Sequence, residues 1–258
     1  MVGQRKLVVF GGKEFDKKPL NDLWILDLQS KEWLEVLDLQ FPLSPRKGHS
    51  AVMIDNQMLV YGGRSSSTKY FGDLAILTFD ENWSPKNWKE IDSSTGTMPS
   101  QRNHHIAAAL PNKMMVIYGG RKDHDEVSDI LTDLWIYSLT ENKWTEVIPI
   151  PDRSLPMFLA YPKPRIEAAS AKVSDSVLLI ASGRDYVGKV LNDAWSLDFT
   201  NVNEVSWKSL APIDCEDVAV STSVMYASTG FFVTLAVVLG LIFYFNIQSR
   251  RAPYERIG

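Results

Sequence analysis

Apolar runs that end in a glycine pair recur four times and dominate the pattern of hydrophobic and polar positions along the chain. The runs span Leu7–Gly12, Met58–Gly63, Met115–Gly120 and Leu178–Gly183, at spacings of 51, 57 and 63 residues. The last copy is degenerate, because Ser182 replaces its first glycine. Short, continuously apolar runs predict strands that are covered on both faces. A glycine pair suits a sharp exit from a strand, where a positive φ is needed.

Three further features recur in register with these runs. An arginine comes before a new alternating run at Arg46, Arg102 and Arg165. An Asp-apolar-Trp signature follows the glycine pair at Asn21–Trp24, Thr132–Trp135 and Asn192–Trp195, and the copy Gly72–Ala75 has lost its tryptophan. A further tryptophan falls 21 to 25 residues after the second glycine position, at Trp33, Trp88, Trp144 and Trp207. Four short strands in each unit of about 50 residues are the pattern of a propeller blade.

The glycine pairs, the spaced tryptophans and the arginines together resemble the kelch repeat family. The resemblance covers roughly Arg5 to Pro212. It implies an all-β fold, a kelch-type β-propeller over residues 1–212. We expect three full blades plus one that lacks its first strand, because no arginine-led run comes before Leu7–Gly12.

Such a set of blades predicts an incomplete ring, and three explanations stay open. The sequence can be an N-terminally truncated product. It can form a small four-bladed ring that closes in another way. Two chains can also complete one ring together.

The C-terminal region carries a different pattern. Residues from Val218 to Ser249 include no charged side chain. About 20 apolar residues span a bilayer, so we expect a stalk at 213–223, a single transmembrane α-helix at 224–247 and a short basic tail at 248–258. The contact with the membrane runs from Met225 to Ile247. The alternative is a helix buried in a globular domain.

The charges that flank this segment predict its orientation. Acidic residues lie before it and Arg250, Arg251 and Arg256 lie after it, and excess arginine marks the cytoplasmic side. This favours a single-pass type I protein with the propeller extracellular or lumenal. However, Met1–Gly12 does not have the pattern of a signal peptide. A tail-anchored adaptor with a cytosolic propeller therefore stays open as the alternative.

Composition narrows the function classes. The net charge of −4 and the pI of about 5.6 argue against a nucleic-acid partner. The kelch resemblance extends to the propeller of galactose oxidase, whose copper site needs a tyrosine cross-linked to a cysteine. The only cysteine here is Cys215, after the repeats. We therefore expect no enzyme, no cofactor and no metal, and a galactose oxidase-like enzyme is the less favoured alternative.

Few histidines are available for a metal site. His49 and His105 occupy the same repeat position, which favours a packing role over metal ligation. Asp123–Glu126 combines carboxylates with His124 and could hold a metal, but we interpret it as a solvated loop tip.

Loops after the second and fourth strands of each blade are expected on one face, where variable loops carry function. Arginines recur on that face, and the resemblance implies an acidic ligand for them. The alternative is that they pair within the blades with Asp22, Asp73, Asp133 and Asp193. Loop residues unique to one blade are further candidates for specificity. The binding-face candidates are Arg46, Arg64, Arg102, Arg121, Arg165, Arg184, Phe15, Tyr70, His124 and Tyr186. The predicted function is a membrane-tethered binding module for a protein or glycan ligand.

Overall fold

The computed structural model describes residues 6–15, 18–37, 43–91, 96–122 and 129–210. All of them lie in the first of two compact units, Met1–Ile213. The second unit, Asp214–Gly258, lies outside the described residues, and so does the expected transmembrane segment 224–247. Among the residues that are described, no helix is long and apolar enough to cross a bilayer.

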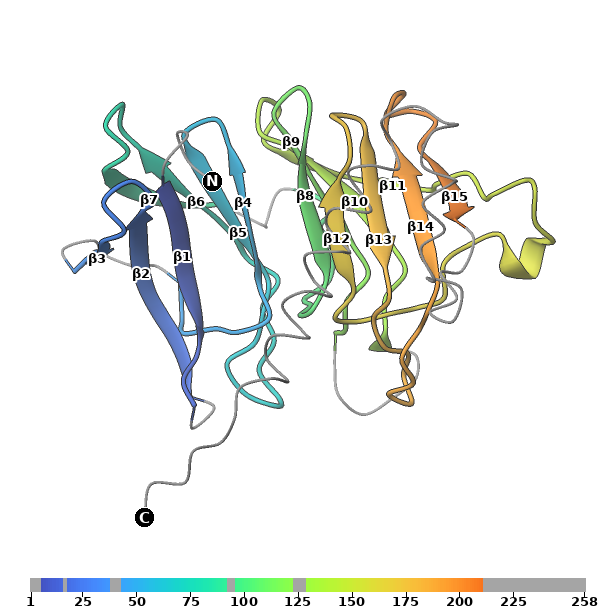
Figure 1. The fold of residues 1–258 in the computed structure, drawn as a ribbon, viewed down its shortest axis with the longest axis horizontal. Coiled ribbons are helices and arrows are strands. Elements are labelled where there is room, and N and C mark those ends of the chain that lie inside the picture. The colour runs from blue at the N-terminus through green and yellow to red at the C-terminus, as the bar shows by residue number, and fades with distance from the viewer. Residues whose placement is uncertain (1–5, 16–17, 38–42, 92–95, 123–128, 211–258) are drawn as a thin grey trace, which may run out of the picture. The chain divides into compact units, whose positions relative to one another are not determined.

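The described chain forms four antiparallel sheets, each with its strands in sequence order (Figure 1). Blade 1 contains β1 (Lys6–Lys13), β2 (Pro19–Asp27) and β3 (Trp33–Glu35). Blade 2 contains β4 (Ser50–Ile54), β5 (Gln57–Tyr61), β6 (Leu74–Phe79) and β7 (Pro85–Ile91). Blade 3 contains β8 (Ile106–Leu110), β9 (Met114–Tyr118), β10 (Leu134–Ser138) and β11 (Lys143–Val147). Blade 4 contains β12 (Ala169–Lys172), β13 (Val177–Ala181), β14 (Ala194–Asp198) and β15 (Ser206–Leu210). A short 3-10 helix, η3 (Met157–Leu159), lies between blades 3 and 4.

This arrangement is the expected all-β, four-bladed propeller arrangement. In the described part of the chain, blades 2 to 4 are four-stranded and blade 1 is three-stranded. The predicted run at Leu7–Gly12 forms β1, the counterpart of the second strand in the other blades.

Blades pack face to face through alternate residues of their second strands. In blade 2, Met58 and Val60 lie in the core shared with blade 1, whereas Leu59 and Tyr61 lie in the core shared with blade 3. Blade 3 repeats the alternation between blades 2 and 4. Because both faces of these strands are covered, their sequence is apolar throughout instead of alternating with polar residues.

The repeated tryptophan of the fourth strand links each of blades 2 to 4 to the blade before it. Its ring contacts the aromatic residue just before the preceding blade's glycine pair. The ring-centroid distances are 5.3 Å for Phe10–Trp88, 5.2 Å for Tyr61–Trp144 and 5.0 Å for Tyr118–Trp207. Tilted and edge-to-face aromatic pairs at such distances stabilise a core beyond the area that they bury. The spacing of Trp88, Trp144 and Trp207 in the sequence therefore reflects one contact made three times, whereas Trp33 is 52% exposed and contacts Trp24 in its own blade.

The second glycine of each pair has a positive φ, as the sequence predicted. Gly63 has φ +93°, and a Cβ there would lie 2.9 Å from the Cβ of His49 and 3.0 Å from the carbonyl oxygen of Lys47. Gly12 occupies the same repeat position with φ +106°, but a Cβ there would meet nothing within 4 Å. An alanine would be strained by the positive φ at either position. Only at Gly63 would its Cβ also clash with the segment that leads into the first strand of the blade.

This difference gives a test of the blade geometry. Gly63→Ala should lower the free energy of unfolding by about 1–3 kcal/mol more than Gly12→Ala does, because only the first adds a steric clash to the backbone strain. Urea denaturation followed by tryptophan fluorescence measures both variants. Equal losses would show that the first strand does not crowd Gly63.

Candidate functional site

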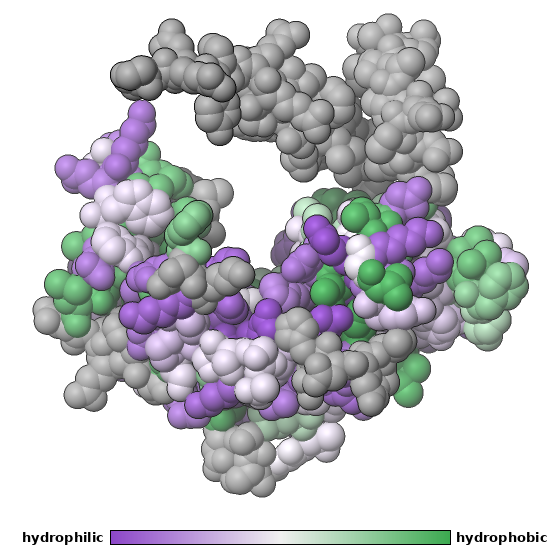
Figure 2. Space-filling view, turned by 90° about the horizontal axis from the view of Figure 1, so that it is seen from below, coloured by the Kyte–Doolittle hydropathy of each residue, from purple (hydrophilic) through white to green (hydrophobic). Residues whose placement is uncertain are grey.

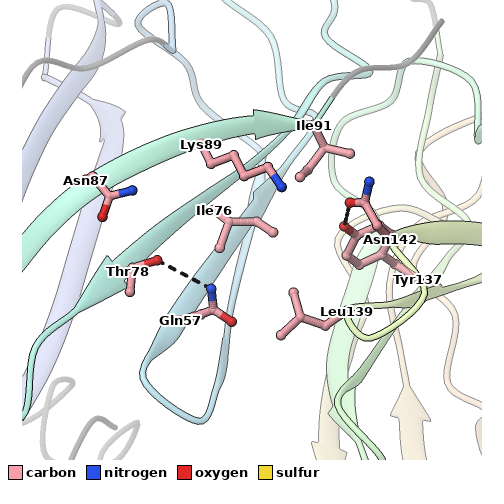
Figure 3. Close-up of a pocket in the computed structure, with 9 residues that line it drawn as sticks. All are labelled: Gln57, Ile76, Thr78, Asn87, Lys89, Ile91, Tyr137, Leu139 and Asn142. Atoms are coloured by element: carbon pink, nitrogen blue, oxygen red, sulfur yellow. Dashed lines mark hydrogen bonds between the residues drawn. The ribbon is translucent and has the colours of Figure 1, made fainter. Parts of the chain in front are cut away.

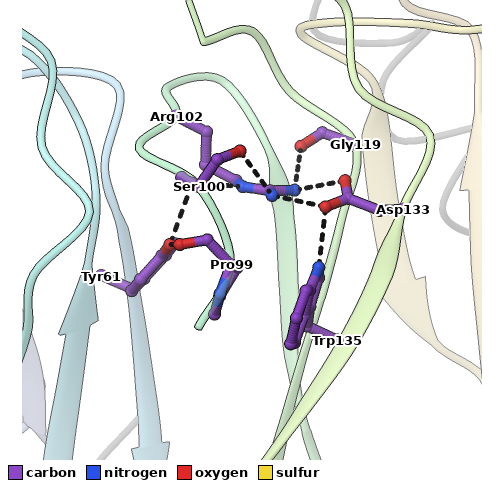
Figure 4. A network of polar contacts seen from close by, with 7 residues as sticks. All are labelled: Tyr61, Pro99, Ser100, Arg102, Gly119, Asp133 and Trp135. Carbon is purple, nitrogen blue, oxygen red and sulfur yellow. Dashed lines mark hydrogen bonds and ion pairs between the residues drawn. The ribbon is translucent and has the colours of Figure 1, made fainter. Parts of the chain in front are cut away.

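Each of the three complete blades contains one buried arginine that bonds to several of its segments. In blade 3, the Arg102 guanidinium donates to both carboxylate oxygens of Asp133 at 2.7 Å and to the carbonyl oxygen of Gly119 at 3.1 Å (Figure 4). Its Nε donates to the carbonyl oxygen of Ser100 at 3.0 Å. The same arrangement joins Arg46 to Asp73 in blade 2 and Arg165 to Asp193 in blade 4. Each arginine therefore links the approach to the first strand with the entry to the third.

A tryptophan completes the arrangement in two of these blades. Trp135 Nε1 donates to Asp133 and Trp195 Nε1 donates to Asp193, both at 2.7 Å. Burial alone would raise the pKa of Asp133, but the hydrogen bonds from Arg102 and Trp135 and the charge of Arg102 outweigh it and hold that pKa below its usual value. Both carboxylates are therefore ionised partners of a fixed guanidinium.

Arg46, Arg102 and Arg165 consequently do not belong to the accessible binding face on which they were candidates. Their exposed fractions are 0%, 0% and 2%. The alternative interpretation, pairing with the repeated aspartates, is what the structure shows for Asp73, Asp133 and Asp193. In blade 1, Asp22 accepts a hydrogen bond from Trp24 at 2.8 Å.

The second set of repeated arginines lies just after the second strand of each complete blade. Arg64, Arg121 and Arg184 each follow a glycine position, and each pairs through its backbone with two neighbouring segments. Arg64, for example, bridges Lys47 on one side and Tyr70 on the other. This double pairing fixes the three Cα positions, while the Arg184 side chain stays 56% exposed and those of Arg64 and Arg121 are partly exposed.

Asn103 connects two of these arginines across the boundary between blades 2 and 3. With its amide oriented to satisfy both groups, its oxygen accepts from Arg64 Nε at 3.0 Å and its nitrogen donates to the carbonyl oxygen of Arg121 at 3.1 Å. The Arg64 guanidinium also lies 5.9 Å from the centroid of the Tyr70 ring. Tyr70 itself is buried, with 6% exposed, so it supports Arg64 and does not form the exposed specificity residue that was predicted.

Three residues with positive φ form a chain of backbone contacts from blade to blade beside these arginines. They are Gly48, His104 and Glu167, with φ of 68°, 53° and 56°. His104 N donates to the carbonyl oxygen of Gly48 at 2.8 Å, and Glu167 N donates to that of His104 at 3.4 Å. The Glu167 carboxylate lies 3.5 Å from Arg184 Nε and 4.0 Å from His104 Nδ1. Sequence reasoning missed Glu167, which replaces the glycine or histidine found in the other blades.

The remaining candidates divide between exposed and undescribed positions. Phe15 is fully exposed and Tyr186 is 52% exposed, each in the loop between the second and third strands of its blade. His124 lies outside the described residues. Figure 2 looks onto the face from which these loops emerge, and hydrophilic residues gather around its middle. We call this surface, with Arg64, Arg121, Glu167 and Arg184, the loop face.

A cleft of about 180 Å³ lies away from the loop face, between blades 2 and 3. Figure 3 shows Lys89 and Ile76 on one wall and Tyr137 on the other, with Tyr137 donating to Asn142 at 2.6 Å. Burial raises the pKa of Tyr137 to about 12, so the phenol stays neutral. The cleft is smaller than typical ligand pockets, and Lys89 is its one ionisable lining group besides that tyrosine.

The repeated histidines are packing groups, as their shared position predicted. His105 Nε2 lies 2.8 Å from Ser50 Oγ, and its ring lies 5.5 Å from that of Tyr61. His49 makes the equivalent ring contact with Phe10, also at 5.5 Å. Burial, assisted by nearby Arg46, lowers the pKa of His49 to about 4, and burial with Arg102 lowers that of His105 to about 3.

Blades held together by arginine–aspartate pairs, with loops gathered on one face, define a β-propeller made of repeated blades. The chain belongs to the kelch-repeat family: residues 1–160 match the model of the KLHDC2/KLHL20/DRC7 Kelch-repeats domain.

The chain is similar in sequence to several proteins of other organisms. An F-box/kelch-repeat protein of Arabidopsis thaliana is 30% identical over 76% of this chain and 41% of its own length. Kelch domain-containing protein 1 of Mus musculus is 27% identical over 63% of this chain and 36% of its own length. A leucine-zipper-like transcriptional regulator 1 homolog of Drosophila melanogaster is 33% identical over 57% of this chain. The chain spans less than half the length of each of these relatives.

The buried histidines predict how stability depends on pH. Their folded-state pKa values lie below the unfolded value of about 6.5, so the unfolded chain binds more protons between pH 6.5 and 4. The free energy of unfolding should fall as the pH is lowered through this window, by up to about 1.4 kcal/mol per pH unit for each histidine.

A double variant tests this assignment. His49→Gln with His105→Gln should flatten the slope between pH 6.5 and 4, while the slope from pH 7 to 8.5 stays unchanged. Urea denaturation at a series of pH values measures both ranges. An unchanged acid slope in the variant would assign the dependence to other groups.

Proposed function

We propose that this chain is a membrane-tethered binding module whose loop face holds an acidic segment of a protein ligand, and that it is not an enzyme. The observation that carries the proposal is the placement of Arg64, Arg121 and Arg184. They occupy one repeat position in three blades, their backbones are fixed on both sides, and their side chains reach solvent.

Carboxylates are the ligands that suit these groups. A guanidinium offers a planar fork of donors that matches a carboxylate, and it remains charged at every physiological pH. Glu167 already places a carboxylate 3.5 Å from Arg184, which supports a carboxylate as the partner of that arginine. A ligand carboxylate would take a similar place, and Glu167 would compete with it.

Charge reversal on the loop face tests the proposal with a fluorescein-labelled octaglutamate peptide as the probe. The triple variant Arg64→Glu, Arg121→Glu and Arg184→Glu should weaken binding at least about tenfold, because exposed charge pairs contribute up to about 1 kcal/mol each. Fluorescence anisotropy measures the affinity. Glu167→Gln should have the opposite effect and strengthen binding severalfold, since it removes the competing carboxylate.

The matched control reverses three lysines near the turns at the other ends of the strands, Lys86, Lys143 and Lys172. It changes the net charge by the same amount and should leave the affinity nearly unchanged. Equal weakening by both triple variants would assign binding to net charge alone. If the native ligand has no acidic groups, as a neutral glycan has none, neither triple variant should change the affinity for that ligand.

The proposed tether rests on the uncharged sequence at 224–247, which lies outside the described residues. Full-length chain made with microsomal membranes should remain in the pellet after alkaline carbonate extraction, and a variant that ends at residue 223 should be released. Protease added to intact vesicles then distinguishes the topologies: a protected propeller supports the type I orientation, and a digested one supports the tail-anchored alternative. Release of the full-length chain by carbonate would refute the tether.

A further inference from the structure

The connection between blades 3 and 4 ends in a cluster of exposed apolar side chains. The 3-10 helix η3 at its tip contains Met157, Phe158 and Leu159, and none of the three is buried. Met157 is 73% exposed and Phe158 is 83% exposed. Figure 1 shows this helix (yellow) projecting beyond β15, and Figure 2 shows the corresponding hydrophobic group at the edge of the molecule. We call residues 149–164 the β11–β12 knob.

The knob is held in place by contacts at its base. Ile150 pairs in parallel with Ser206, with backbone hydrogen bonds of 2.7 Å to Val205 and 2.9 Å from Trp207. The Asp152 carboxylate accepts from the Ser154 hydroxyl at 2.6 Å and from the Ser209 backbone N–H at 2.8 Å. These contacts anchor the base of the knob to blade 4, so the apolar side chains at its tip belong to a folded segment.

The exposed charged residues of the knob are all basic. Asp152 is its only acidic residue, and that carboxylate is 7% exposed and engaged at the base. Arg153 and Lys163 flank the tip in the sequence, and both are exposed. The accessible surface of the knob thus combines an apolar tip with basic flanks.

From this combination we infer that the β11–β12 knob inserts its tip into the interface of a membrane that carries anionic lipids. Apolar and aromatic residues enter the boundary between headgroups and acyl chains to a depth of about 5–10 Å, and basic residues beside them meet lipid phosphates. The inference does not depend on an acidic ligand at the loop face. The proposed tether would favour insertion of the tip, because it would hold the propeller close to lipid.

A protein groove fits the knob less well. Stable protein interfaces bury about 800 Å² on each partner and involve about 20–30 residues a side. The exposed apolar residues here are Met157, Phe158, Leu159 and Tyr161, with Ile148 just before the knob, which is a small convex set. A few apolar residues with basic neighbours are, in contrast, a usual second signal for membrane contact.

An environment-sensitive probe tests the insertion directly in the full-length chain. Cys215→Ser removes the native thiol, and Phe158→Cys then carries the dye NBD. With vesicles of phosphatidylcholine and about 30% phosphatidylserine, the NBD emission should shift to shorter wavelength, rise severalfold and be quenched by a lipid-borne spin label. The matched control carries NBD at Ser67→Cys, an exposed loop position, and should stay aqueous.

Two further variants separate the contributions. Met157→Ser with Leu159→Ser in the labelled chain should abolish the NBD response without loss of folding, because neither side chain is buried. Arg153→Glu with Lys163→Glu should reduce the response at least threefold, and about 0.5 M sodium chloride should act in the same direction. An equal response on pure phosphatidylcholine would overturn the role of anionic lipid.

The probe reports its own surroundings, so this test is separate from that of the tether. An NBD group that stays aqueous on vesicles to which the chain is bound would overturn the insertion while leaving the tether intact. A chain that carbonate releases, but whose probe still enters anionic vesicles, would retain the insertion and lose the tether.

Discussion

The buried pairing of an arginine with an aspartate is the interaction on which blades 2 to 4 depend. A guanidinium that is removed from water must have its donors satisfied, and each of these arginines meets two carboxylate oxygens and two backbone carbonyls. These partners come from three separate stretches of one blade. The pair therefore ties the segment before the first strand to the start of the third strand, with the second strand between them. Removing one member would leave the other charged and buried, which is costlier than losing the attraction alone.

Packing between blades follows from that arrangement within them. Once four strands are in register, alternate residues of the second strand face opposite neighbours, and the tryptophan of the fourth strand reaches the aromatic residue of the preceding blade. The glycine pair allows the chain to turn beside the first strand, where a Cβ at Gly62 would lie 2.6 Å from the carbonyl oxygen of Arg102 in the next blade. Ser182 adopts φ 59° at the equivalent place in blade 4. The recurring arginines, tryptophans and glycine pairs thus each make one contact of the same repeated blade structure.

The repeat was readable from the sequence because each of its features has a structural cause that leaves a fixed spacing. The division among the arginines was not readable. Arg46 and Arg64 both recur, and spacing alone does not say which side chain turns inward; the decisive fact is the distance to Asp73. Tyr70 was misassigned for a similar reason, since a residue unique to one loop can still be buried. The knob escaped notice because Met157 and Phe158 read as ordinary loop residues until their exposure was known.

Three equivalent positions that take no part in the arginine–aspartate pairs differ in side chain from blade to blade. Gly48, His104 and Glu167 hold equivalent backbone positions with positive φ, yet their side chains differ completely. The backbone contacts from one to the next keep the geometry constant while the chemistry varies. A ligand that approached this place would meet no side chain from one blade, an imidazole from the second and a carboxylate paired with Arg184 from the third. Repetition in the blades thus keeps the backbone geometry constant, and the side chains at these equivalent positions differ from blade to blade.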